Sequence, residues 1–169
     1  TINEADEKVA DTTSFYFPRA AEWTTLGVEE ASRRHNSCLF GAGAYLSTPS
    51  DLARFGSAML KPGLLKADTV TLLRTPLHLA SGASTDFALG WKVVHVQLAG
   101  AQTQMVAHRA TPMGGTAALL MFPDHRLVIA ATSNVSNAAG VAPFVLADIV
   151  KIALGAALLP KAEKIIANV

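Results

Sequence analysis

Two apolar runs of strand length, residues 116–122 and 127–132, constrain the fold more than any other feature of the sequence. A short polar turn around Asp124 joins them, which predicts a β-hairpin. Neither run alternates cleanly between apolar and polar residues, so both faces of the sheet must bury side chains. We therefore expect an α+β fold, an α/β sandwich in which helices cover both faces of an antiparallel sheet.

Two more strands are predicted before the hairpin, which gives a meander of antiparallel strands over residues 86–134. The first runs over residues 87–98 and is rich in β-branched valines, and the second runs over residues 102–107. His108 and Arg109 follow the second run directly, where a core strand reaches solvent. Rigid scaffolds often hold reactive groups at such a rim, so both residues are candidate functional residues.

A helix is predicted over residues 49–60 because the sequence before it carries start signals. Thr48 is expected as the N-cap, Pro49 occupies the first helical position, and Asp51 is placed to reach back as in a capping box. Apolar residues at spacings of three and four give this helix one face that packs on the core.

The rest of the chain is less clearly patterned. Residues 1–80 are expected to be mainly loops and helices, with a second helix over residues 68–74 and irregular structure before residue 35. After the sheet, residues 138–154 predict a C-terminal helix that packs on it. Charged residues and a proline interrupt the apolar stretch over residues 141–159, so we expect a buried helix there and no membrane span.

Composition excludes several classes of function. The 169 residues suffice for one domain, and 14 Lys and Arg against 13 Asp and Glu leave a net charge of +1 with no basic run. Nothing therefore indicates nucleic acid or an anionic membrane as a partner. The single cysteine, Cys38, is expected to be a small buried residue, and no histidine spacing matches a metal motif. We expect no metal or other cofactor.

Four blocks of the sequence carry a family resemblance. Residues 41–55, 87–91, 108–115 and 127–134 resemble the C-terminal half of serine β-lactamase-related proteins, the superfamily of class C β-lactamases, esterases and D-alanyl-peptidases. The resemblance implies that residues 1–169 are a single C-terminal fragment of a β-lactamase-like domain with an incomplete fold. It also implies a serine hydrolase of the penicillin-binding type as the parent protein, in an extracytoplasmic location.

Two motifs that the resemblance leads one to expect are absent from the sequence. Such enzymes carry the nucleophilic serine in Ser-x-x-Lys and follow it with Tyr-x-Asn. No serine here stands three residues before a lysine, and neither Tyr16 nor Tyr45 begins a Tyr-x-Asn triplet. We therefore expect the chain alone to be inactive, and its partner to be the missing N-terminal half, which would carry the nucleophile.

The resemblance assigns roles to the residues at the strand end. His108 occupies the place of the lysine in the family's Lys-Thr-Gly triplet, as in its His-x-Gly variant, and is expected to be catalytic. The Thr111 N–H would form half of the oxyanion hole, and Arg109 would steer a substrate carboxylate. Ala110 replaces the family's glycine, and its methyl group would crowd a substrate backbone.

Two hypotheses remain open from the sequence. In the first, the chain belongs to a hydrolase that acts on a small ester or amide, such as a β-lactam, a peptide or an ester. In the second, it is a non-catalytic binding or assembly module that kept the fold, which Ala110 favours. Without the N-terminal half, apolar area that is normally covered should be exposed, which predicts self-association.

Overall fold

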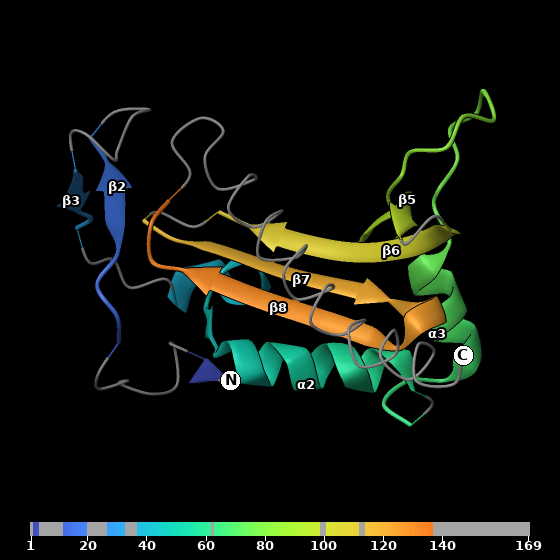
Figure 1. Cartoon of the computed structure of the whole chain (residues 1–169), viewed down its shortest axis with the longest axis horizontal. Coiled ribbons are helices and arrows are strands. Elements are labelled where there is room, and N and C mark those ends of the chain that lie inside the picture. The colour runs from blue at the N-terminus through green and yellow to red at the C-terminus, as the bar shows by residue number, and fades with distance from the viewer. Residues whose placement is uncertain are drawn as a thin grey trace, which may run out of the picture.

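The structure is a computed structural model that describes residues 2–3, 12–19, 27–32, 37–61, 63–98, 101–111 and 114–136 (Figure 1). This part of the chain has a mixed α+β architecture, with antiparallel sheets and two α-helices. The helix predicted over residues 138–154 lies outside the described residues.

The largest sheet has four antiparallel strands in the order β5-β6-β7-β8, which confirms the predicted meander. The strands are β5 (Lys92–Leu98), β6 (Ala101–Ala110), β7 (Thr116–Phe122) and β8 (Leu127–Ser133). The 3-10 helix η2 (Pro123–His125) closes the predicted hairpin between β7 and β8. Arg126 follows it in the left-handed region with φ 49°, which lets the chain reverse into β8.

Two strand boundaries differ from the prediction by three residues or more. The prediction that residues 87–91 belong to the first strand is wrong, because Asp86 and Gly90 have φ values of 58° and 81° and bend the backbone into a turn. At the other end, β6 continues to Ala110 instead of ending at residue 107. His108 and Arg109 therefore lie inside a paired strand, where their directions are set by the pleat.

One face of the sheet packs against α2 (Pro49–Leu60), which lies alongside β8 in Figure 1. The predicted N-cap of α2 is confirmed, since the Thr48 Oγ1 accepts from the Asp51 N–H at 3.2 Å. The Asp51 side chain, expected to reach back to the cap, pairs with Arg54 at 2.9 Å. Gly56 brings the helix close to the sheet: a Cβ there would lie 2.7 Å from a methyl carbon of Val128. The second helix, α3 (Ala67–Arg74), begins one position before the predicted start.

Both faces of the sheet bury apolar side chains, as the lack of alternation predicted. The face toward α2 includes Val106, Leu119 and Met121, whereas the opposite face includes Leu120 and Phe122. Phe122 is only 1% exposed. The opposite face therefore also carries a buried apolar cluster.

The N-terminal part contains short paired strands, so the expectation of irregular structure there is wrong in part. Two antiparallel pairs are present: β1 (Ile2–Asn3) with β4 (Tyr45–Leu46), and β2 (Tyr16–Pro18) with β3 (Val28–Glu30). The 3-10 helix η1 (Ser37–Ala42) precedes β4 and carries Cys38, which is exposed. The prediction that Cys38 is buried is therefore wrong: its position in η1 leaves it exposed.

Candidate active site

His108 lies near the end of β6, on the face of the sheet that α2 covers. It pairs with Leu119 of β7 and shares its face with Val106, two positions earlier on the same strand. Both of these neighbours are buried, but the His108 side chain is exposed. The ring therefore stands at the point where the α2-facing core meets solvent, as the sequence predicted for a strand end.

The turn before β5 holds the His108 ring. The Nδ1 atom lies 2.8 Å from the main-chain oxygen of Gly90, a hydrogen-bond distance. The indole of Trp91 meets the imidazole edge-on, with ring centroids 6.1 Å apart and planes at 80°. Sequence reasoning missed this contact, although Gly90 and Trp91 were already part of a block of the family resemblance.

Main-chain hydrogen bonds stabilise the turn over residues 86–93. The Ala88 N–H donates to the Trp91 carbonyl at 2.8 Å, and the Val93 N–H donates to the Asp86 carbonyl at 2.7 Å. Trp91 is also buried in the cluster under α2. The carbonyl of Gly90 thus belongs to a turn that is fixed by two main-chain hydrogen bonds and by the buried side chain of Trp91.

The three predicted residues after His108 do not all lie on its face of the sheet. Ala110 shares the face of His108, whereas Arg109, between them on the strand, points to the opposite face. The structure therefore does not bring Arg109 together with His108. Thr111 follows the strand directly and is exposed.

At this end, no described strand pairs with β6 on its β5 side. Pairing between β5 and β6 stops at Lys92 and Ala107, but pairing between β6 and β7 continues to Ala110. Among the described strands, none covers the edge of β6 beyond Ala107. Such an open edge offers main-chain donors and acceptors to an extended ligand.

An N-terminal segment is tied to the same end of the sheet, which the sequence did not reveal. The Tyr16 N–H donates to the carbonyls of Gly114 and Asn134, at 3.1 and 2.9 Å. The Asn134 side chain donates to the Ser14 carbonyl at 3.0 Å. A Cβ on Gly114 would lie 2.5 Å from the Cβ of Phe15, so only glycine allows this close approach. In Figure 1, β2 and β3 stand beyond this end of the sheet.

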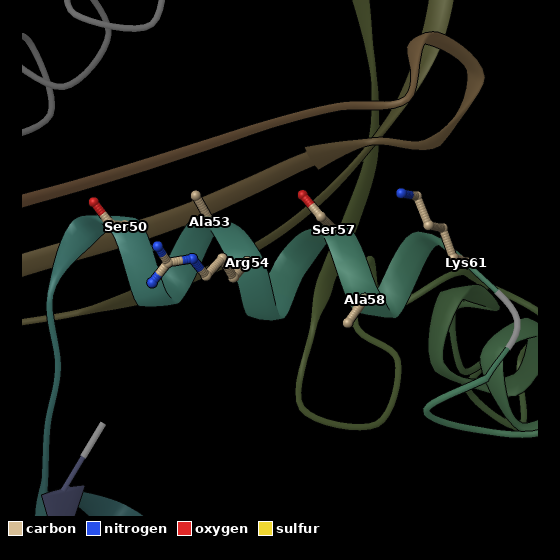
Figure 2. Close-up of a pocket in the computed structure, with 6 residues that line it drawn as sticks. All are labelled: Ser50, Ala53, Arg54, Ser57, Ala58 and Lys61. Atoms are coloured by element: carbon tan, nitrogen blue, oxygen red, sulfur yellow. The ribbon is translucent and has the colours of Figure 1, made fainter.

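A hollow of about 460 Å³ occurs elsewhere, along the side of α2 that faces away from the sheet. Figure 2 shows its six lining residues, which all come from α2 and the residue after it: Ser50, Ala53, Arg54, Ser57, Ala58 and Lys61. Arg54 forms an ion pair with Asp51 at 2.9 Å. Ser57 and Lys61 are not joined by a hydrogen bond in the described structure. We place the candidate site at His108, where the geometry is built by several elements.

Within the described residues, no three His, Cys, Asp or Glu side chains are grouped to hold a metal ion. In the same part of the chain, no helix combines the length and apolar character needed to cross a membrane.

Comparison with known proteins supports the sequence resemblance. No curated protein matches the chain. The family model described as Beta-lactamase matches residues 1–153, a span that includes the turn around Gly90, the strand end with His108 and the hairpin that follows. The chain therefore belongs to the β-lactamase family.

Proposed function

We propose that this chain is the sheet-bearing part of a serine hydrolase of the β-lactamase and penicillin-binding type. The parent enzyme would cleave an ester or amide through an acyl-serine intermediate. The observation that carries the proposal is the family match over residues 1–153 of the 169. The position of His108 at an open strand end, on the face toward α2, is consistent with it.

The proposed catalytic group is His108. It occupies the place of the lysine in the family's sheet triplet, and its exposed ring can reach a substrate at the rim. The Thr111 N–H is proposed as one oxyanion donor, because Thr111 directly follows the strand that carries His108 and is an exposed residue. Arg109 is proposed only as a more distant guide for a substrate carboxylate, since it leaves the strand on the opposite face.

The nucleophile is proposed to come from a segment outside these 169 residues. None of the serines here stands in Ser-x-x-Lys, and the serine nearest to a lysine on α2, Ser57, lacks a hydrogen-bonded base in the described structure. The chain alone is then inactive, because the sheet supplies positioning and oxyanion donors without a group to be acylated.

The complete fold is proposed to be a three-layer α/β sandwich. Phe122 and Leu120 are buried on the face opposite α2, so that face requires a covering layer of its own. The helix predicted over residues 138–154 is proposed to supply part of that layer.

The missing N-terminal half is proposed as the partner of an apolar surface beside β5. Four large side chains on the segment between α3 and β5 are about half exposed: Leu77, Leu79, Phe87 and Leu89. Figure 1 shows this segment extending away from the sheet. Exposed apolar groups in this number are typical of a surface that is normally covered, and without its cover the chain is expected to self-associate.

The test begins with the coding sequence before the codon for Thr1. If it encodes Ser-x-x-Lys and Tyr-x-Asn, the full-length protein should hydrolyse a chromogenic cephalosporin or a nitrophenyl ester. It should also be labelled covalently by a fluorescent penicillin or an acyl phosphonate. Replacement of the motif serine with alanine should remove both turnover and label. Intact motifs without turnover or label would contradict the proposal.

The second candidate is a non-catalytic binding or assembly module derived from the same fold. Ala110 favours it, because its side chain lies on the face of His108 and would crowd a substrate backbone that approaches the strand. Substitution Ala110→Gly distinguishes the two: in a hydrolase it should raise kcat/KM, whereas a binding module should remain without turnover. Degenerate serine and tyrosine motifs would favour the module.

A further inference from the structure

The hydrogen bond between His108 and Gly90 determines which ring nitrogen carries the proton. A carbonyl oxygen can only accept, so at 2.8 Å the Nδ1 atom must be the donor. In the neutral imidazole, the other nitrogen, Nε2, then has no hydrogen and presents a lone pair. The bonded nitrogen faces the turn, and Nε2 lies on the opposite side of an exposed ring.

We propose that Gly90 and Trp91 are positioning residues that hold His108 as the Nδ1–H tautomer, with Nε2 as a hydrogen-bond acceptor toward the substrate. Gly90 supplies the accepting carbonyl, and the Trp91 ring, nearly perpendicular to the imidazole, limits its rotation. A lysine in the same place would present only N–H donors. The neutral His108 site therefore favours a substrate group that donates, a hydroxyl or an amide N–H, over a carboxylate.

The backbone at Gly90 makes this arrangement specific to a few residue types. Its φ of 81° lies in the left-handed region, which glycine adopts freely and asparagine tolerates, but which a β-branched residue resists. A Cβ at this position would meet no heavy atom within 4 Å, so substitution changes the backbone preference without a steric clash. Gly90→Asn and Gly90→Val are therefore a matched pair of variants that differ in their preference for this conformation.

The tautomer can be measured on this chain by NMR with ¹⁵N-labelled histidine. Long-range spectra correlate the carbon-bound protons of each imidazole with its two ring nitrogens. The His108 Nε2 resonance should appear at the downfield position of an unprotonated nitrogen, and Nδ1 at the upfield position of a protonated one. His95 and His125 are internal references, since the described structure shows no hydrogen bond to either ring. A His108 spectrum with Nε2–H, or one like those of the two references, would overturn the proposal.

The two Gly90 variants test whether the backbone at Gly90 sets the tautomer of His108. Gly90→Asn should keep the His108 pattern, and Gly90→Val should shift it toward the references. If Gly90→Val does not fold, as judged by circular dichroism, the spectra of the wild-type chain and of Gly90→Asn still test the tautomer of His108. An unchanged His108 pattern in a folded Gly90→Val would overturn the role of Gly90.

The substrate preference rests on the proposed function. It is tested separately in the full-length enzyme that carries the serine and tyrosine motifs. His108→Lys, which replaces an acceptor with obligate donors, should raise kcat/KM for a carboxylate-bearing ester relative to its neutral analogue by about tenfold or more. An unchanged ratio would overturn the preference but not the tautomer. Absence of any turnover in an enzyme with intact motifs would overturn the proposed function and the preference together, whereas the spectrum would still decide the tautomer.

Discussion

Gly56 offers the sharpest test of how α2 packs on the sheet. A Cβ added there would lie 2.7 Å from Val128 Cγ1 and 3.1 Å from Leu119 Cδ1. Carbon atoms pack best at about 3.5–4.0 Å, so in Gly56→Ala the helix or the strand must move by roughly 0.8 Å. Val128 cannot rotate away cheaply, because a β-branched side chain is stiff at χ1.

Two opposing effects determine the size of the change. Alanine in place of a mid-helix glycine stabilises a helix by about 1 kcal/mol. Overpacking a core typically costs about 1–3 kcal/mol. We expect the overpacking to dominate and Gly56→Ala to lower the free energy of unfolding by about 1 kcal/mol, which corresponds to a Tm about 2–4 °C lower for a chain of this size.

Thermal unfolding followed by circular dichroism measures the effect, and two further variants identify its cause. Ser57→Ala, next along the helix on its outer side, should change stability by less than about 0.5 kcal/mol. In the double variant Gly56→Ala with Val128→Ala, the loss should be smaller than the sum of the single losses by about 0.5 kcal/mol or more. A Tm that rises in Gly56→Ala, or strict additivity with Val128→Ala, would refute the close approach of α2 to β8.

Four other predictions follow from the site and the fold. The purified chain should hydrolyse neither a chromogenic cephalosporin nor a nitrophenyl ester faster than buffer, and activity that depends on a serine within it would contradict this. In the full-length enzyme, His108→Ala should lower kcat/KM by about 10- to 1,000-fold without unfolding the protein, whereas His125→Ala, in the turn at the other end of β7, should have little effect; equal effects would remove His108 from the site. Thr48→Ala should lower the free energy of unfolding by about 0.5–2 kcal/mol in urea titrations, because the Asp51 N–H loses its acceptor, and Thr48→Ser should retain most of the stability. The chain should sediment with concentration-dependent association that Phe87→Gln reduces, and a clean monomer at high concentration would count against an uncovered apolar surface.

The sequence alone determined the elements that depend on local patterns. The strand over residues 116–122 and the helix over residues 49–60 were predicted with the bounds that the structure shows. Their signals are local: an apolar run bounded by a turn in one case, and a capping threonine followed by proline in the other. The position of His108 at a strand end also followed from the sequence, because the apolar run stops there.

The tertiary structure alone decided how that strand end is used. The contact from His108 to Gly90 joins residues 18 positions apart, and the turn that makes it depends on positive φ values at Asp86 and Gly90, so the run over residues 87–91 was mistaken for a strand. The attachment of Tyr16 to Asn134 spans most of the described chain. Such contacts arise when separate elements pack together, and no local pattern of apolar and polar residues encodes which carbonyl will face which ring.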